Sequence, residues 1–389
     1  MLLNYKIVIP LYQTQMMDTI KFYLYYLDSI FSGYPFIIRT TVFLVMLLVT
    51  LYVIAILRIL IRERTRNKSL KRQEKISETY KSKLISVLLT DKDMSFYEVK
   101  DILNPNDNAL KNWEKKYLTY LIIGIKNNPG LNENNYKHVL EIFPVTDFWE
   151  KKIQQNDVSE NINALRILDQ IKEGISGSFF TKKINSNDAT LRKHIKSEYL
   201  KYASNDAFKF LENNFDKDFN ALDAVRLHDS LKERNAIRPL PLLTKWLKNS
   251  DNQDFQTFII REIGYFNQRK TAPFLIQMFK ASNSDLVKSE ISNTLGVLNY
   301  EEAVDELAEE YHYKNTVVQE SIIDMMGKIK SKESFEFLKK IYPETQNGET
   351  MIKIIKNMYK IDKQKTNAFV KKSTTSDFEK EALAYIQNI

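Results

Sequence analysis

Three stretches in the C-terminal half share one pattern: REIGYFNQRKTAPFLIQMF from Arg261, NTLGVLNYEEAVDELAEEY from Asn293 and DMMGKIKSKESFEFLKKIY from Asp324. They superpose without gaps. Their glycines, 32 and 31 residues apart, are Gly264, Gly296 and Gly327. A fixed period of about 20 to 50 residues is typical of supersecondary units that stack into an array. The sequence therefore predicts a repeat protein over this region.

Each repeat has the pattern of two antiparallel helices. The first begins near TAPFLIQMF, where Pro273 is tolerated in the first turn. The second is expected from Asp285 to Leu295, with Leu286, Ile291 and Leu295 on its buried stripe. We expect Gly296, like the other two glycines, to follow the helix and to adopt the left-handed conformation of a C-terminal cap.

The pattern continues with lower fidelity on both sides, which predicts about six helical hairpins over residues 157–363. Residues 364–389 are expected to form a C-terminal capping helix, and residues 84–156 a helical stalk or a divergent cap. With only 9 Gly and 9 Pro in 389 residues, turn-rich all-β folds fit poorly. The predicted fold class is all-α.

At these residues the chain resembles the HEAT-repeat family, including the short HEAT-like units of phycobilisome lyases. The resemblance rests on the first helix that carries Pro273, the turn residues around Asn283 and Asn315, and a second helix that ends in "LG" or "MG". The family's usual Arg in the second helix is present unevenly, as Arg192 and Arg226. The resemblance implies a right-handed α-solenoid.

Residues 36–61 include an uncharged stretch of 18 residues from Thr40 to Leu57. At a rise of 1.5 Å per residue this stretch is about 27 Å long, close to the roughly 30 Å hydrocarbon core of a bilayer. Bulky and basic residues follow it, and no cleavage site of small residues is seen, so we expect an uncleaved transmembrane helix rather than a signal peptide.

The net charge of +8 is concentrated directly after this span. Between Arg58 and Lys83, ten Lys and Arg residues face three Glu, a local charge of +7 that leaves +1 for the rest of the chain. Residues 62–83 are expected to form a basic juxtamembrane helix. Because positively charged residues that flank a span remain on the cytoplasmic side, we expect the solenoid in the cytoplasm. An anionic lipid surface is the expected partner of this helix.

Residues 1–35 are then expected on the non-cytoplasmic side of an inner or plasma membrane. Ile20, Leu24, Leu27 and Phe31 recur at helical spacing, which favours an interfacial helix. A re-entrant hairpin that turns at Pro35 is the alternative.

The sequence has no pattern that indicates catalysis. Cys is absent, which excludes disulfides, thiolate metal sites and a cysteine nucleophile, and the four His residues lie far apart in sequence. His228, Asp229 and Ser230 are neighbours on one helical turn and point in different directions, so they do not predict a catalytic triad. We expect no catalytic residue, no metal and no cofactor.

The candidate binding residues are those that repeat along the array. Arg261, Asn293 and Asp324 share one repeat position and form a candidate polar row. The second group, Tyr265, Tyr311 and Tyr313, lies near turns between helices, where Tyr is favoured at interfaces.

The favoured function is therefore a membrane-tethered scaffold or adaptor that binds a partner protein. Resemblance to membrane-anchored bacterial HEAT proteins implies a regulatory subunit of a membrane complex, such as one with a glycosyltransferase. The alternative is an enzyme or a nucleic-acid-binding protein on a HEAT scaffold, lyase-like or glycosylase-like. A repeat region with almost no net charge lacks the electrostatic attraction that nucleic acid requires, and no small-molecule substrate is expected.

Overall fold

The computed structural model describes residues 33–105, 110–211 and 217–373, with residues 21–23, 25, 26, 29, 215 and 386. In these residues every regular element is helical, which confirms the all-α class. The chain divides into two compact units, residues 1–132 and 133–389. The interfacial or re-entrant helix expected in residues 1–35 and the capping helix expected in residues 364–389 lie largely outside the described residues.

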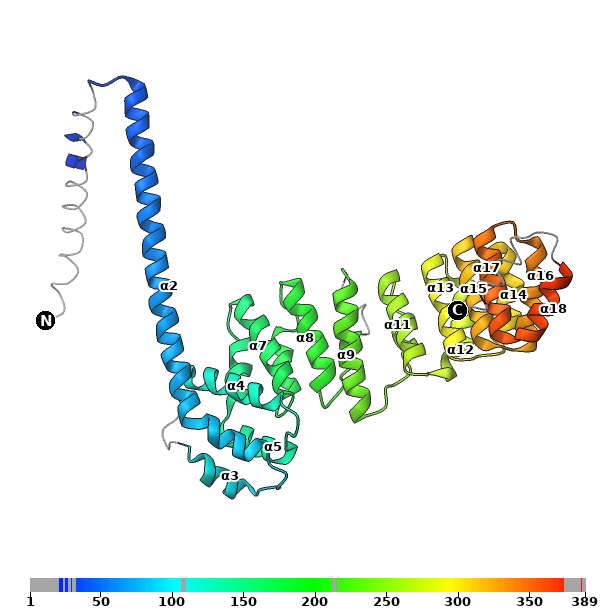
Figure 1. The fold of residues 1–389 in the computed structure, drawn as a ribbon, viewed down its shortest axis with the longest axis horizontal. Helices are drawn as coiled ribbons and strands as arrows, with labels where there is room; N and C mark the ends of the chain where they lie inside the picture. Colours follow the sequence, from blue (N-terminus) through cyan, green and yellow to red (C-terminus); the bar gives the residue numbers. More distant parts are fainter. Residues whose placement is uncertain are drawn as a thin grey trace. The chain divides into compact units, whose positions relative to one another are not determined.

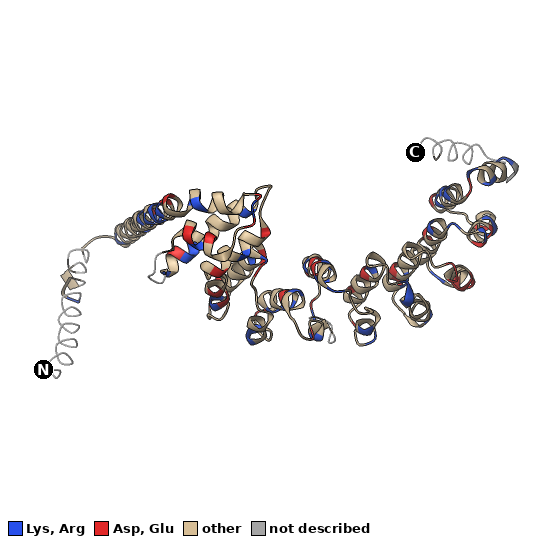
Figure 2. Ribbon diagram, turned by 90° about the horizontal axis from the view of Figure 1, so that it is seen from below, with Lys and Arg blue, Asp and Glu red and all other residues tan. Residues whose placement is uncertain are grey.

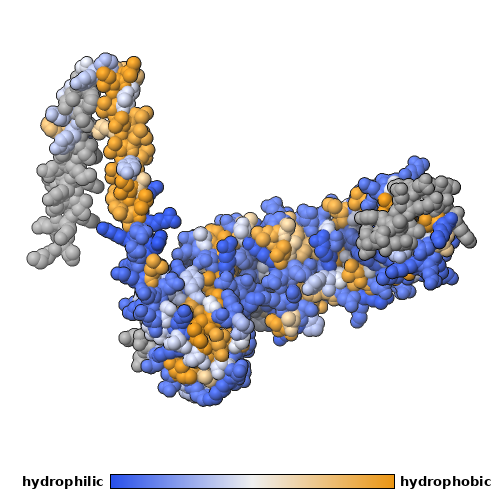
Figure 3. Space-filling model, in the orientation of Figure 1, coloured by the Kyte–Doolittle hydropathy of each residue, from blue (hydrophilic) through white to orange (hydrophobic). Residues whose placement is uncertain are grey.

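The first unit is dominated by one helix of 53 residues, α2 (Phe36–Leu88). It starts after Pro35, and no Gly or Pro interrupts it. An 18-residue window near its start has a mean hydropathy of 2.8, and none of that window is buried in the structure. Figure 3 shows this helix as an apolar column followed by a hydrophilic block. By length and composition α2 is a candidate membrane span.

The last turns of α2 pack into the small core of the first unit. Ile76, Tyr80, Leu84 and Leu88 are buried there, against α3 (Phe96–Leu103) and α4 (Asn112–Lys126). Their spacing of four residues places them on one face of the helix. A single continuous helix thus connects the exposed apolar segment, the basic segment and a folded helical unit (Figure 1).

The second unit begins with shorter helices: α5 (Glu133–Ile142), α6 (Val145–Ile153), α7 (Val158–Ile171), the 3₁₀ turn η1 (Gly177–Lys183), α8 (Ala189–Tyr202), η2 (Lys209–Leu211), α9 (Ala221–Ile237) and α10 (Thr244–Leu247). Neighbouring helices pack in chain order, α6 on α7 and α8 on α9. Lys193 and Asp223 form a buried ion pair between α8 and α9, 2.7 Å apart.

The regular repeats follow as α11 (Gln253–Tyr265), η3 (Arg269–Thr271), α12 (Ala272–Ala281), α13 (Asp285–Val297), α14 (Ala303–Glu310), η4 (Tyr311–Tyr313), α15 (Thr316–Ile329), α16 (Lys332–Ile341), η5 (Tyr342–Glu344), α17 (Gly348–Ile361) and α18 (Lys363–Ser373). The second helices of the repeats, α11, α13, α15 and α17, stack on one another, and α12, α14 and α16 form the other layer. Figure 2 shows the two rows of helices.

The caps explain where the second helices begin. The side chains of Asn252, Ser284, Asn315 and Asn347 each accept a hydrogen bond from a backbone N–H in the first turn of the following helix. Such caps satisfy amide groups that have no partner within the helix. Pro273 lies in the first turn of α12, as the sequence predicts.

The buried stripe of α13 differs from expectation at one position. Leu295 and Ile291 are fully buried, but Leu286 is 58% exposed and Val287 is buried instead. The spacing of four residues through Val287, Ile291 and Leu295 keeps those side chains on one face, and Leu286 is rotated away from it by about 100°.

The repeat glycines also have another role than expected. Gly264, Gly296 and Gly327 lie inside α11, α13 and α15, and the left-handed residues come three positions later, at Asn267, Asn299 and Lys330. A Cβ added at Gly327 would lie 2.1 Å from Oδ1 of Asn357 in α17, and one at Gly296 would lie 3.1 Å from Cα of Met325 in α15. The glycines therefore permit close approach of successive second helices rather than capping them.

Candidate protein-binding surface

The stacked second helices present one shared face, which we call the second-helix face. Residues separated by 7 or 11 positions lie nearly above one another on an α-helix. On α13 this places Leu286, Asn293 and Val297 in one line, and the exposed fractions of Leu286 and Val297 are 58% and 57%. The corresponding lines are Asp254, Arg261 and Tyr265 on α11, and Val317, Asp324 and Lys328 on α15.

Side-chain hydrogen bonds align these helices at their N-terminal ends. The hydroxyl of Ser284, which caps α13, donates to Oε1 of Gln253 in α11 at 2.9 Å. Nδ2 of Asn315, which caps α15, donates to Oδ2 of Asp285 in α13 at 2.6 Å. Leu286 and Val317, at the second positions of neighbouring helices, therefore lie at the same end of the face.

The polar row predicted from the sequence occupies the middle of this face. Arg261 is exposed, and Asn293 and Asp324 are half-buried. Arg261 Nε donates to Glu290 Oε1 at 3.1 Å, which joins α11 to α13, and this hydrogen bond raises the pKa of the guanidinium.

Asp324 joins α15 to α17 in the same way. Its Oδ1 accepts from Nδ2 of Asn357 at 3.0 Å, and its Oδ2 lies 3.1 Å from Nζ of Lys353. Lys353 also contacts Glu320 at 2.9 Å. Two of the three row residues thus take part in polar contacts between neighbouring helices.

The three tyrosines have different environments. Tyr265 and Tyr313 are exposed, by 54% and 83%. Tyr311 is 5% exposed and packs edge-on against Phe337 at 5.4 Å between ring centroids, and burial raises the pKa of its phenol. Its expected role in partner contact is therefore corrected, because the first residue of η4 points into the core rather than toward solvent.

His228 has a partner that its sequence neighbours do not reveal. Its Nδ1 lies 2.9 Å from Oε2 of Glu262 in α11, and its ring packs in a T-shaped arrangement with Tyr265 at 4.5 Å between centroids. Glu262 is 3% exposed, and burial raises the pKa of its carboxyl while His228 lowers it. The pair joins α9 to α11, so it adds a polar contact on the N-terminal side of the stacked second helices.

The comparison with known families agrees with this geometry. A family model for HEAT repeats matches residues 240–314, from α10 through η4. Residues 240–314 are therefore similar to HEAT repeats. No curated protein matches the chain. The matched region includes Gly264 and Gly296, two of the positions where second helices make close contact.

The HEAT repeats expose apolar side chains that sequence periodicity missed. On the second-helix face these are Tyr265, Leu286, Val297 and Val317, and α9 adds Leu222 and Val225 with exposed fractions of 55% and 66%. The signal was present in the sequence, since Leu286 and Val317 each stand two residues after an N-cap and outside the buried stripe. Clustered apolar residues on an otherwise polar surface are typical of interaction sites.

The same face becomes basic toward α17. Lys328 on α15 and Lys356 and Lys360 on α17 lie at or near its edge, and all three are exposed. Burial is the main cause of the lowered pKa of Lys360. Repulsion from Lys356, Lys328 and Lys330 lowers this pKa further, whereas attraction to Asp324 raises it. Three exposed lysines close together at one edge favour an acidic group on a ligand.

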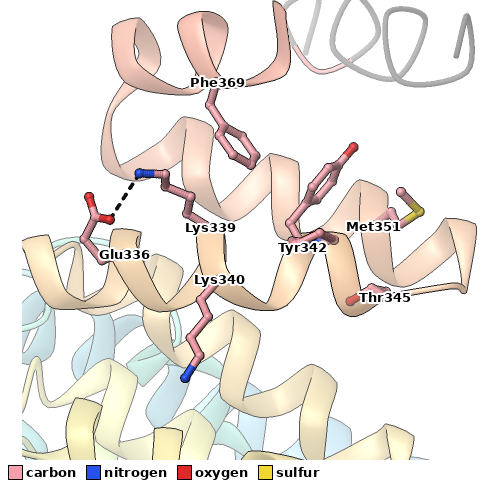
Figure 4. Close-up of a pocket in the computed structure, with 8 residues that line it drawn as sticks. Glu336, Lys339, Lys340, Tyr342, Thr345, Met351 and Phe369 are labelled. Atoms are coloured by element: carbon pink, nitrogen blue, oxygen red, sulfur yellow. Dashed lines mark hydrogen bonds and ion pairs between the residues drawn. The ribbon is translucent and has the colours of Figure 1, made fainter. Parts of the chain in front are cut away.

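A cavity of about 460 Å³ lies beside α16 and α18, after the region that matches HEAT repeats. Figure 4 shows the rings of Tyr342 and Phe369 near each other there, with Lys340 directed away. Lys339 is paired with Glu336 at 3.4 Å. No group of three or more His, Asp or Glu residues suited to a metal ion occurs in the part of the chain that the structure describes.

Proposed function

We propose that this chain is a membrane-tethered scaffold whose HEAT repeats bind a partner protein through the second-helix face. HEAT repeats supply a helical scaffold for protein interaction. The observation that carries the proposal is the group of apolar side chains that successive second helices expose together, namely Tyr265, Leu286, Val297 and Val317.

The chemistry of the face indicates the chemistry of the partner. Its apolar part lies on α11, α13 and the start of α15, and Lys328, Lys356 and Lys360 follow toward α17. Protein interfaces combine buried apolar contacts with charged groups that stay near solvent. The partner surface that fits carries apolar residues with acidic residues on one side of them.

The tether in this proposal is α2. An apolar helix whose 18-residue window is entirely unburied in the structure has no core of its own to enter, and a lipid bilayer would cover it. The basic residues that follow favour a cytoplasmic location for the HEAT repeats. A partner within the same membrane complex, such as a glycosyltransferase, agrees with the resemblance to membrane-anchored bacterial HEAT proteins.

We infer a binding role rather than a catalytic one for the second-helix face. Several ionisable side chains described there pair between neighbouring helices, as Arg261 with Glu290 and Lys353 with Asp324 do. These pairs align the repeats. A catalytic group would instead need a pocket in which it could meet a substrate.

The test compares two triple variants of the full chain, purified in detergent with whatever partner co-purifies from the native membrane. In the first, Leu286→Ser, Val297→Ser and Val317→Ser remove apolar contact area from the face. The matched control replaces exposed apolar residues elsewhere in the second unit, Val158→Ser, Ile237→Ser and Leu242→Ser.

We expect the first variant to lose the partners that wild type retains, because the three substitutions remove apolar surface that the partner would bury. The control should retain them. Both variants should melt close to wild type, since exposed substitutions change stability by roughly 0.5 kcal/mol or less each. Retention of every wild-type partner by the first variant would contradict the proposed face.

A further inference from the structure

A stripe of basic residues follows the candidate membrane span on α2. Arg64, Lys68, Lys71, Arg72 and Lys75 line a surface pocket of about 510 Å³ together with Asn67 of α2 and Trp113 of α4. Arg64, Lys68, Lys71 and Lys75 are three or four residues apart, and Arg72 follows Lys68 by four, which places them on one side of the helix. The guanidinium of Arg72 lies over the Trp113 ring, 5.1 Å from its centroid.

The stripe is not neutralised by the protein. No carboxylate lines the pocket, and among the described residues the only ion pair of the basic segment joins Arg66 to Glu63, at 3.9 Å and outside the pocket. Elsewhere in the chain Lys353, Lys193 and Arg261 are each paired with a carboxylate. Five unpaired cations beside an aromatic ring form a site for a ligand with several negative charges.

The position of the stripe identifies the ligand, on the basis of the proposed membrane tether. The apolar segment ends at Ile61. Arg64 follows it by three residues and lies about 4 Å further along the helix axis, and Lys75 follows it by fourteen residues and lies about 21 Å further along. The polar headgroup layer is about 5 to 8 Å thick on each side of the bilayer. A phosphate at the membrane surface therefore reaches Arg64 and Lys68, whereas Arg72 and Trp113 lie beyond that layer.

We propose that this pocket binds a membrane lipid whose headgroup carries more than one phosphate and projects from the bilayer surface. The lower phosphate contacts Arg64 and Lys68. The upper phosphate contacts Lys71, Arg72 and Lys75, while Trp113 packs against the non-phosphate part of the headgroup. Arginine suits this role because its planar fork donates two hydrogen bonds to one phosphate.

The probe for this site is the fluorescence of Trp113. The chain has three Trp residues, and the other two, Trp149 and Trp246, are only 3% and 2% exposed in the cores of the second unit. The full chain is reconstituted into phosphatidylcholine nanodiscs that contain either phosphatidylinositol bisphosphate or an amount of phosphatidylglycerol matched in total charge. Inorganic phosphate and soluble inositol trisphosphate are added in separate arms.

We expect a saturable change in Trp fluorescence with the bisphosphate lipid, and a response about tenfold weaker or more with phosphatidylglycerol, because the single phosphate of phosphatidylglycerol stays in the headgroup layer and does not reach Lys71, Arg72 and Lys75. Inorganic phosphate should not compete at millimolar concentration. Competition by inositol trisphosphate but not by inorganic phosphate would confirm headgroup recognition. Equal responses to both lipids would show only a non-specific basic helix and would overturn the proposal.

Two charge-matched variants separate a site from a general charge effect. Lys68→Gln, Lys71→Gln and Arg72→Gln remove three charges from the stripe, whereas Arg62→Gln, Arg66→Gln and Lys81→Gln remove three from positions of α2 that do not line the pocket. The first variant should lose the preference for the bisphosphate lipid and the second should keep it. Equal loss in both would overturn the proposal.

The membrane tether is tested separately in the same samples. Co-purification of each variant with the nanodiscs reports the apolar span, which these substitutions do not touch. A chain that fails to enter nanodiscs contradicts the proposed tether, whereas a chain that enters them without lipid preference contradicts only the headgroup site.

Discussion

Single glycines, which have no side chain, set the distance between neighbouring second helices. A Cβ added to Gly327 would meet three atoms of Asn357, its Oδ1 at 2.1 Å, its Cγ at 2.5 Å and its Cβ at 2.7 Å. Rotation of the Asn357 side chain cannot relieve the contact with Cβ, so the helices themselves would have to move. At Gly264 the nearest atom is Cγ2 of Thr294 at 3.3 Å, which leaves room for a small adjustment.

We therefore predict that Gly327→Ala destabilises the HEAT repeats by about 1 to 3 kcal/mol, the usual cost of overpacking. Gly264→Ala should be close to neutral, because alanine gains up to about 1 kcal/mol of helix propensity against a mild contact. Urea unfolding of both variants, followed by circular dichroism, measures the difference. Equal midpoints for the two variants would show that close approach is not what these glycines provide.

The helices illustrate which parts of the fold can be predicted from the sequence. The first turn of α12 at Pro273 and the burial of Leu295 follow from local rules, because they depend on one helix and its buried stripe. The role of Gly296 does not, since Met325 in a different helix determines it. Periodicity also assigned Leu286 to the core, although its angle on the helix places it at the surface.

From the sequence, only the position of the candidate site could be predicted, and not the contacts that its residues make. Repeat spacing placed Arg261, Asn293 and Asp324 on one surface, and helix geometry places them on the second-helix face. Their pairing could not be foreseen, because Glu290 and Asn357 lie 29 and 33 residues away in neighbouring helices. Whether this row contacts a partner stays a prediction.

Leu295 and Leu286 form a matched pair on α13. Leu295 is fully buried in the core shared by neighbouring repeats, so Leu295→Asp places an unpaired carboxylate there and should cost at least about 3 kcal/mol. Leu286→Asp changes an exposed residue and should cost about 0.5 kcal/mol or less. Thermal melting with hydrogen exchange across α11 to α15 measures both. Similar melting of the two variants would contradict the register of α13.

The capping box of α3 predicts a local pH dependence. A hydrogen bond from the backbone of Ser95, with additional contributions from Lys92, lowers the pKa of Glu98 to about 2 from its ordinary 4.5. Because the folded-state pKa is the lower one, the stabilisation is complete above pH 4.5 and is lost as the pH falls toward 2. The difference in melting midpoint between wild type and Glu98→Ala should therefore shrink over that interval. A difference in melting midpoint that stays constant down to pH 2 would contradict a stabilising role for the capping box of α3.

At the scale of the whole molecule, the asymmetry of charge around α2 predicts on which side of the membrane the repeats lie in the proposed tethered chain. Ten Lys and Arg follow the apolar stretch between Arg58 and Lys83, whereas only Lys6, Lys21 and Arg39 precede it. Transfer of positive residues across the membrane is disfavoured during insertion, and residues within about 15 to 20 positions of the span count most.

We predict that the C-terminal end lies in the cytoplasm. A reporter that folds only in the cytoplasm, fused after Ile389, should be active, and one that is active only after export should be silent. The charge asymmetry is reversed in a variant that has Gln in place of Arg62, Arg64, Arg66 and Lys68 and four added Lys after residue 30. This variant should insert partly in the opposite orientation, because the charge asymmetry rather than the length of the apolar segment selects the side. An active export reporter on the unmodified chain would place the HEAT repeats outside, and both the proposed partner surface and the headgroup site would then face the outer leaflet.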